Sequence, residues 1–330
     1  MRHLLRRVGF YLVALWAAVT FNFIIPRLMP GDPAEAYIAK LQGQHVTRQE
    51  MDSIRKLFGV NPNVPLWRQY FDYLNSLLHG NLGIATSQFP TSVIDVLRQS
   101  LPWTIALVGV ALILSFLIGT VVGILVAWRR GSWYDTAVPP ILTFLSAVPY
   151  FWMALALVYV FGIGLNWFPP NGGYDVFNVT PGWNSDFILS IVQHAILPVI
   201  TLVIGSLAGW VLTMRNTMIT TLSEDYVMMA QAKGLPERRV MFNYAARNAI
   251  LPSITSFSIS LGLVVSGSLL TEIVFNYPGI GYALYQAVQA DDYALVEGCF
   301  LVIAVAVLIA NFLSELVYTF LDPRVRREGS

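Results

Sequence analysis

Charged side chains are scarce in this chain of 330 residues: Asp, Glu, Lys and Arg together make up 12% of it. Soluble domains carry about 25% charged residues, so the chain has half of the usual share. Hydrophobic residues make up 56%, and the mean hydropathy is +0.61. The charges are too few to cover a soluble surface of this size, which predicts a protein that crosses a membrane several times. The net charge of +1 gives no electrostatic reason to expect nucleic acid as a partner.

Lysine and cysteine are nearly absent. None of the three lysines follows a glycine, so the Gly-Lys-Ser/Thr ending of a P-loop is missing and the chain cannot be a P-loop ATPase by itself. The single Cys299 lies in an apolar run, which favours a small buried side chain and excludes an intramolecular disulfide or a cysteine metal cluster. Zinc-protease and nucleophile-elbow motifs are also missing. We therefore predict no catalytic residue, no metal site and no cofactor of the chain's own.

Long apolar runs predict an all-α protein with six transmembrane helices, since about 20 helical residues cross a hydrocarbon core of about 30 Å. The expected spans are Val8 to Leu28, Thr104 to Trp128, part of Thr136 to Phe168, Phe187 to Met214, Ala249 to Leu270, and Gly298 to Phe320. The first is preceded by three arginines and lacks a cleavage site, which favours a retained signal anchor over a removed signal peptide.

Basic residues orient these spans. One side carries Arg2, Arg6, Arg7, Arg129, Arg130, Arg215, Lys233, Arg238, Arg239, Arg247, Arg324, Arg326 and Arg327. Two short loops on the other side, 166–186 and 276–297, contain neither Lys nor Arg. The positive-inside rule then places both termini and the 224–247 loop in the cytoplasm.

The first two spans are separated by an external insert with helical signals. Thr47 to Glu50 forms a capping-box pattern, which predicts a helix up to about Phe58. Pro65 suits the first turn of a second helix that ends near His79-Gly80. A third, amphipathic stretch is expected from Thr91 to Leu101. The insert is either a scaffold over the bundle or a platform for an external partner.

Few ionisable groups fall within or beside the spans. His194 and Glu272 lie at span ends, where local capping or pairing is the favoured interpretation. Glu315 lies inside the sixth span, one turn from Asn311, and an acidic residue there is costly unless it is paired or hydrated. A structural hydrogen bond to a neighbouring helix is favoured over proton coupling or an electrostatic role near the cytoplasmic gate.

The cytoplasmic loop has the pattern of a partner-binding element. Asp225 to Gly234 predicts a short helix closed by glycine, and a second helical stretch begins at Pro236. Ala230 and Gly234 are four residues apart, so they share one face, where small side chains would let another surface approach closely. A solvated loop that touches nothing is the simpler alternative.

At this loop the chain resembles the permease subunits of ATP-binding-cassette importers of the dipeptide/oligopeptide class. The family's alanine-rich turn, glycine and hydrophobic-Leu-Pro ending are matched by 228–234 and 250–252, although Met228 stands where the wider superfamily has Glu. Further matches follow in order along the chain: Pro30-Gly31-Asp32-Pro33, Leu101-Pro102-Trp103-Thr104, Arg130 to Asp135, Thr271 to Gly281, Asp292-Tyr293 and Leu321 to Arg326.

The resemblance implies a type I importer permease in a bacterial cytoplasmic (inner) membrane. A paralogous second permease subunit, two cytoplasmic ATPase subunits that bind ATP and Mg, and an external solute-binding protein would complete the importer. The implied units are an N-terminal span (1–30), an extracytoplasmic insert (31–93), a transmembrane core (94–320) with the coupling loop (224–247), and a cytoplasmic tail (321–330). The implied ATPase contacts are Asp225, Tyr226, Ala230, Ala232, Lys233, Gly234, Arg238 and Arg239.

The translocation path is expected along the later spans. Ser256, Ser260, Ser266 and Ser268 would give it small polar positions, or would equally serve helix packing. The resemblance implies peptides as cargo, with oligosaccharides, nickel chelates and glutathione as alternatives. An ion-coupled secondary transporter and a purely structural membrane anchor are the alternatives from other classes.

Overall fold

The structure is a computed structural model that describes residues 2–28, 37, 64–264 and 268–321. Within these residues the chain forms helices and no β-strand, apart from one isolated bridge between Ile84 and Ser92. The elements with their bounds are α1 (Arg2–Leu28), α4 (Leu66–Leu78), η1 (Thr86–Gln88), α5 (Val93–Trp128), α6 (Trp133–Ala147), α7 (Tyr150–Leu157), η2 (Val158–Gly164), α8 (Ser185–Leu222), α9 (Asp225–Ala232), α10 (Glu237–Arg239), η3 (Val240–Ala246), α11 (Arg247–Ala249), α12 (Leu251–Gly262), α13 (Leu269–Val274), α14 (Ile280–Gln289) and α15 (Tyr293–Leu321).

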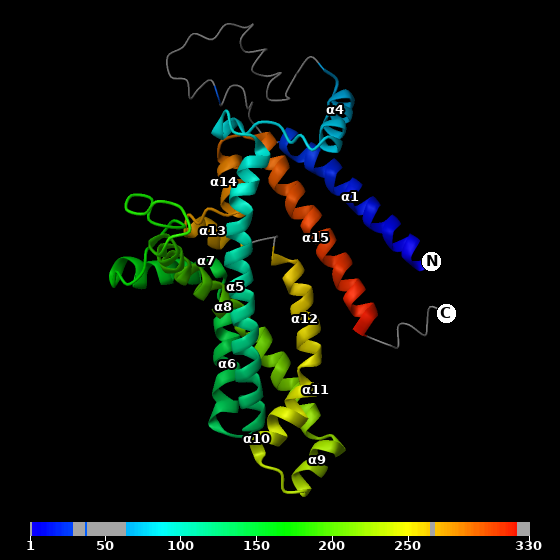
Figure 1. Ribbon diagram of the computed structural model, residues 1–330, viewed down its shortest axis with the longest axis vertical. Helices are drawn as coiled ribbons and strands as arrows, with labels where there is room; N and C mark the ends of the chain where they lie inside the picture. Colours follow the sequence, from blue (N-terminus) through cyan, green and yellow to red (C-terminus); the bar gives the residue numbers. More distant parts are fainter. Residues whose placement is uncertain (1, 29–36, 38–63, 265–267, 322–330) are drawn as a thin grey trace.

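The long helices form an elongated bundle (Figure 1). Helices α9, α10 and α11 lie at one end, here called the α9 end, while α4 and α14 lie at the other, here called the α14 end. Helix α1 lies beside α15 and away from the centre of the bundle. The prediction of a mostly helical protein is confirmed for the described part of the chain.

Helices α5 and α8 form the central pair, and each begins with a side-chain cap. The Ser92 hydroxyl accepts a hydrogen bond from the Asp95 N–H, and the Asn184 amide oxygen accepts one from the Phe187 N–H. The two helices run parallel, with Ser115 Oγ 2.8 Å from Ser206 Oγ. A Cβ added at Gly123 would lie 2.7 Å from the Cβ of Met214, so only glycine allows this close approach.

Four described helical segments are long and apolar enough to cross a membrane: Gly9–Leu28, Val93–Trp128, Ser185–Leu222 and Tyr293–Phe312. A fifth crossing would be α6 followed by the helical stretch Tyr150–Gly164, which are bent by 95° relative to each other. Pro149 restricts Val148 to an extended conformation at this break. The fifth predicted span, Ala249 to Leu270, is not one long helix: α12 has 12 residues, about 18 Å of helix.

The insert agrees with the sequence in part. Helix α4 begins after Pro65 and ends before His79 and Gly80, as predicted, and Gly80 has a φ of +69°. The amphipathic stretch expected over Thr91 to Leu101 is helical from Val93, with Val96 and Leu97 buried and Asp95 and Arg98 exposed, and it continues unbroken through Pro102 into the second span as α5. The helix expected at Thr47 to Phe58 and His45 lie outside the described residues.

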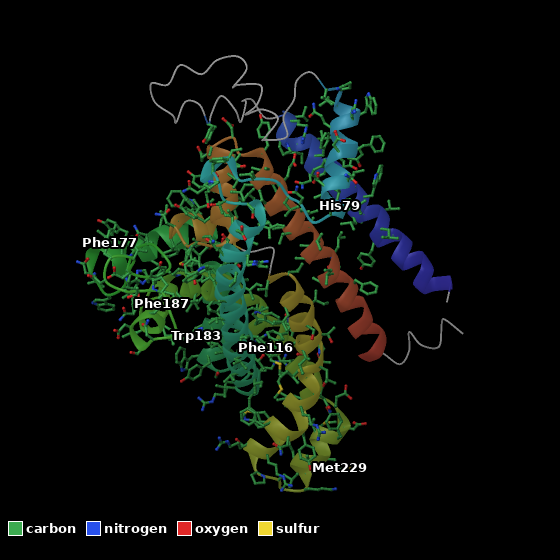
Figure 2. All side chains as sticks on the ribbon, turned by 45° about the horizontal axis from the view of Figure 1, so that its top comes forward. His79, Phe116, Phe177, Trp183, Phe187 and Met229 are labelled. Atoms are coloured by element: carbon green, nitrogen blue, oxygen red, sulfur yellow. The ribbon has the colours of Figure 1, made fainter. Side chains whose placement is uncertain are left out.

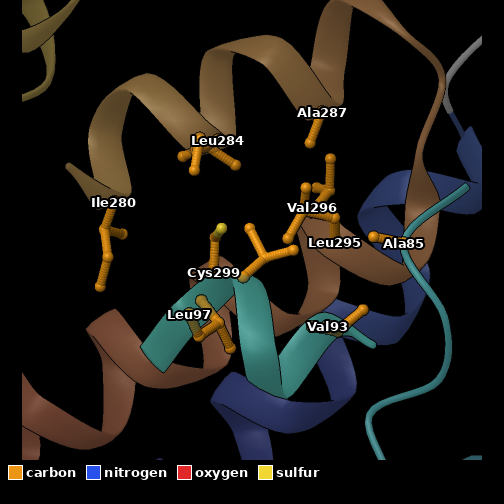
Figure 3. Close-up of a cluster of buried hydrophobic side chains, with 11 residues drawn as sticks. Ala85, Val93, Leu97, Ile280, Leu284, Ala287, Leu295, Val296 and Cys299 are labelled. Carbon is orange, nitrogen blue, oxygen red and sulfur yellow. The ribbon is translucent and has the colours of Figure 1, made fainter. Parts of the chain in front are cut away.

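A buried apolar cluster holds the α14 end together (Figure 3). It joins the first turns of α5, through Val93 and Leu97, to Leu284 of α14 and Leu295 of α15. Cys299 lies inside this cluster and is fully buried, which confirms its interpretation as a small buried side chain. A second cluster, described below, fills the α9 end.

Candidate functional site

The short helix α9 is formed as the sequence predicts. It begins after Glu224 and ends at Ala232, and Gly234 follows with a φ of +71°. The Gly234 N–H donates to the Gln231 carbonyl oxygen at 2.9 Å and so closes the last turn. Glycine adopts this left-handed conformation without the steric cost that a side chain adds.

The inner face of α9 is packed against the chain's own bundle. Val227 and Ala230 are 0% and 3% exposed, and they belong to a cluster with Met214 and Met218 of α8 and Ala245 of η3. The prediction that Ala230 faces a partner is therefore wrong. Its small side chain lets α9 approach the end of α8, and that surface belongs to the same chain.

The outer face of α9 is open. Met228 is 49% exposed and Met229 is 59% exposed, and Met229 lies at the far tip of the α9 end (Figure 2). The predicted contact residues exposed on this loop are Asp225, Tyr226, Ala232, Lys233, Gly234, Arg238 and Arg239. The Tyr226 hydroxyl also accepts a hydrogen bond from the Asn248 side-chain amide at 2.8 Å, which ties the start of α9 to α11.

Sequence reasoning missed Met228 and Met229 as surface residues. Apolar residues occupy both faces of α9, with Val227 and Ala230 inside and the two methionines outside. The spacing of apolar residues therefore does not indicate which face of α9 is exposed. Two adjacent methionines in a water-exposed loop were the available clue, because methionine is common at adaptable binding surfaces.

An ion pair braces the α9 end from the side. Arg215 of α8 donates from Nε to the Asp135 carboxylate of α6 at 2.7 Å, with Nη2 at 2.6 Å from the same oxygen. The second carboxylate oxygen accepts from the Gly131 N–H at 3.0 Å. Both side chains are mostly buried, so the contact links α6, α8 and the turn between α5 and α6.

Replacing Arg215 with alanine is expected to lower the free energy of unfolding by about 2 kcal/mol, because a largely buried carboxylate loses its charged donor. The thermal midpoint of the purified protein in lipid nanodiscs measures this. Arg130→Ala removes an exposed arginine near the same turn and serves as the matched control. Equal losses for the two variants would contradict a specific role for the Arg215–Asp135 pair.

A buried carboxylate organises the α14 end. Glu272 of α13 is fully buried, and its oxygens accept from the Thr104 hydroxyl of α5 at 2.8 Å and from the Gly281 N–H at the start of α14 at 2.7 Å. The Ile280 N–H donates to the Thr104 hydroxyl oxygen at 2.8 Å. The expected local pairing of Glu272 is confirmed, and we call these groups the Glu272 network.

Tyr277 and His194 are two further polar groups in this part of the molecule. Burial, together with the nearby Glu272 carboxylate, raises the pKa of Tyr277 to about 12, so its phenol stays protonated. His194 pairs within its own helix, with Nδ1 2.7 Å from the Ser190 carbonyl oxygen, as the sequence suggested. No group of three or more metal-ligating side chains occurs among the described residues.

The serines predicted to line a path are spread unevenly. Ser256 on α12 is exposed, while the half-buried Ser260 donates its hydroxyl to the Ser256 carbonyl at 2.9 Å. Ser268 is half-buried, and Ser266 lies outside the described residues. Ser253, which the sequence analysis did not single out, is 1% exposed with no hydrogen-bond partner for its hydroxyl.

The polar residues of α15 differ from the expectation. Asn311 is exposed, and the Glu315 side chain lies outside the described residues. Another acidic residue of this helix is paired instead: Glu297 forms an ion pair with Arg27 at the end of α1. The Asn22 side-chain amide donates to the Glu297 carbonyl oxygen at 2.6 Å. Sequence reasoning missed this link between the first and last long helices, since its members are some 270 residues apart.

Residues 119–327 match the family described as the binding-protein-dependent transport system inner membrane component, and residues 1–108 match the N-terminal region of such membrane components. The chain belongs to this family.

Relatives of this permease family match along nearly the whole chain. A putative peptide permease protein of Brucella suis is 36% identical over 327 residues, which cover 99% of both chains. The di/tripeptide transport system permease protein of Pseudomonas aeruginosa is 32% identical, with 98% of each chain covered. The dipeptide transport system permease protein of Escherichia coli is 32% identical, with 99% of each covered.

Membership of this family establishes the general role of the chain. It is a transmembrane permease component of a binding-protein-dependent transport system, so it is a transporter subunit and not an enzyme by itself. Its several apolar helices agree with a multi-pass location in the membrane.

Proposed function

We propose that this chain is one of two non-identical permease subunits of an ATP-driven importer for dipeptides and oligopeptides. The names of its relatives, which describe peptide, dipeptide and di/tripeptide permeases, support peptides as the cargo. A second permease subunit, two cytoplasmic ATPase subunits and an external solute-binding protein complete the assembly. ATP and Mg bind to the ATPase subunits, and this chain needs no cofactor.

In this proposal the fold is that of a type I importer permease with six membrane crossings. They are α1, α5, the bent pair α6–α7, α8, the segment from α12 to α13, and α15. Both termini and the α9 end lie in the cytoplasm, where Arg129, Arg130 and the basic residues of 224–247 gather. The α14 end and the insert are external, in agreement with the absence of Lys and Arg from 166–186 and 276–297.

The observation that carries the proposal is the two-sided packing of α9. Its outer face presents Met228 and Met229 to water, which suits a groove on an ATPase. Its inner face is buried against Met214 and Met218, the last turns of the 38-residue helix α8. A displacement of α9 by the ATPase is therefore passed to α8 through side chains already in contact.

The transport cycle follows from this connection. ATP binding closes the ATPase pair and moves the α9 helices of the two permease subunits, and the bundles turn from inward-facing to outward-facing. Peptide from the binding protein enters, and hydrolysis restores the first state. Such a change is a rigid-body switch between two packed arrangements.

Met229→Asp is expected to release the ATPase while leaving the permease folded. The aspartate places a charge in the apolar contact, which costs about 2 kcal/mol or more at a central interface position. The complex is purified through a tag on this chain, and the ATPase subunits that co-purify are quantified by mass spectrometry. Met229→Leu keeps an apolar side chain at the same position and is expected to retain them.

Two results would overturn the proposal. The first is recovery of no ATPase with the unaltered chain, which would favour a secondary transporter that works alone. The second is equal ATPase recovery from the Asp and Leu variants, which would remove α9 from the contact. Uptake of a labelled dipeptide that survives collapse of the proton gradient but stops on ATP depletion separates the two energy sources.

A further inference from the structure

Helix α4 has more apolar surface than its contact with α1 covers. On one part of this surface, Tyr70 and Tyr73 pack on Phe23 of α1, with ring centroids 5.2 Å and 5.5 Å from the Phe23 ring. On the adjoining part, Trp67, Phe71 and Leu78 are 64%, 61% and 86% exposed. One half of the apolar surface of α4 is therefore covered by α1, and the other half is open.

The open half is a continuous stripe. Trp67, Phe71, Leu74 and Leu78 are spaced by four, three and four residues, which places them in one line along the helix. We call these four residues the α4 stripe. Arg68 and Asp72 are exposed on another side of α4, and the exposed Asn75, four residues after Phe71, borders the stripe. An amphipathic helix of this kind needs an apolar neighbour for its stripe.

The contacts with α1 fix the level of α4 along the bundle. The Tyr70 hydroxyl is 2.7 Å from the Thr20 hydroxyl, and the Asn22 side-chain amide donates to the Tyr73 hydroxyl at 3.2 Å. Thr20 and Asn22 lie inside the apolar span Gly9–Leu28. They precede its last residue by about 12 Å and about 9 Å of helix at 1.5 Å per residue.

This level corresponds to the edge of the hydrocarbon layer. A span of about 20 residues crosses about 30 Å, and the apolar run ending at Leu28 is followed in the sequence by Pro30, Gly31 and Asp32, so the edge of the hydrocarbon layer lies near Leu28. Helix α4 contacts α1 about 10 Å along the helix from that point. Amphipathic helices at membrane surfaces bury their apolar faces about 5–10 Å into the boundary between headgroups and acyl chains. Tryptophan and tyrosine are enriched at this depth, and tryptophan, phenylalanine and leucine are typical of the apolar face of such helices.

We propose that α4 is a membrane-surface helix whose stripe of Trp67, Phe71, Leu74 and Leu78 contacts the acyl chains of the surrounding phospholipid. The assignment of that lipid to the outer leaflet rests on the orientation in the proposed function; the lipid contact itself does not. A soluble binding protein would have to enter the hydrocarbon layer to cover the stripe. Arg68 and Asp72 remain outside the stripe, on the side of α4 that faces water.

The test compares the two faces of α4 in the intact complex. Phe71→Cys and Asp72→Cys are labelled with a bimane fluorophore, and the complex is reconstituted in nanodiscs of phosphatidylcholine and phosphatidylglycerol. Cys299 is fully buried, so the unaltered chain reports background labelling. The lipids carry either ordinary acyl chains or chains brominated near the carboxyl end, and iodide serves as the quencher from water.

The bimane at residue 71 is expected to lose most of its emission in brominated lipid and little with iodide, whereas the bimane at residue 72 shows the reverse. Shielding of residue 71 from both quenchers would overturn the proposal in favour of a protein partner or another segment of this chain. Strong iodide quenching at both residues would place α4 in water. ATPase recovery is measured on the same preparations, so a failure of the proposed function is recognised separately.

Discussion

Replacing Gly279 with alanine is expected to destabilise the protein by about 3 kcal/mol or more, because a buried carboxyl group loses the hydrogen bonds that offset its burial. Gly279 precedes α14 with a φ of −89°, which alanine adopts without strain, so the backbone is not the cause. An added Cβ would lie 2.5 Å from the Glu272 carboxyl carbon and would clash with the Thr104 hydroxyl. The Glu272 carboxylate cannot remain where it is.

The loss is large because Glu272 and Thr104 are fully buried, so solvent does not reach the groups that lose their hydrogen bonds. Glu272 is 0% exposed, and its displacement gives up the Thr104 hydroxyl and the N–H groups of Gly281 and Tyr282. Thr104 in turn loses the Ile280 N–H. These bonds join α5, α13 and α14, so the whole α14 end is affected.

Thermal unfolding of the complex in nanodiscs measures the loss, and Gly109→Ala is the matched control. Gly109 lies on α5 and has nothing within 4 Å of an added Cβ. The Gly279 substitution is also made in a Glu272→Ala background, where much of its cost should disappear because the two residues are coupled. An undiminished cost in that background would show that the Glu272 network is not the reason.

Ala230→Asp is expected to detach α9 from the bundle and to abolish ATP-dependent uptake. Ala230 is 3% exposed within the cluster that contains Met214 and Met218, so the new carboxylate would be buried there without a partner. Helix α9 is only eight residues long, and its undocking relieves the burial at lower cost than unfolding the bundle. The change in global stability is therefore expected to be small.

Hydrogen exchange reports the detachment as loss of protection across 225–234, while α5 and α8 keep theirs. Ala232→Asp places the same charge two residues away on an exposed position and is expected to leave the exchange pattern of α9 unchanged. If Ala230 faced a partner, as its spacing from Gly234 suggested, both variants would keep α9 docked. If α9 remained protected from exchange in the Ala230→Asp variant, Ala230 would have to lie on the outer face of α9.

Local signals in the sequence predicted local structure well. Gly234 follows the end of α9, and Gly80 follows the end of α4. Both residues have a positive φ, which glycine adopts more easily than other residues, so the two helix ends were predictable. Proline was less informative. Pro102 lies within α5 and Pro139 within α6, whereas the chain bends at Pro149. Which proline breaks a helix depends on whether neighbouring groups satisfy the freed carbonyl.

The remaining features depend on contacts between distant segments. Which face of α9 is buried depends on its contact with the end of α8, and the order of side chains within α9 does not indicate that face. The Arg27–Glu297 ion pair joins α1 to α15, and either residue alone reads as an ordinary charge at a helix end. Glu272 was recognisable as a locally paired group, but its link to Thr104 across the bundle was not.

The glycine-lined contact between α5 and α8 also bears on the biosynthesis of the protein. Its members, such as Ser115 and Ser206, are separated by 91 residues of chain. Helix α5 therefore leaves the ribosome and enters the bilayer well before α8 exists, and its glycine face at Gly119 and Gly123 first meets lipid. A Cβ at either glycine would clash with α8, so substitutions at these glycines are expected to disturb the later packing of α8 against α5 and to leave insertion of α5 intact.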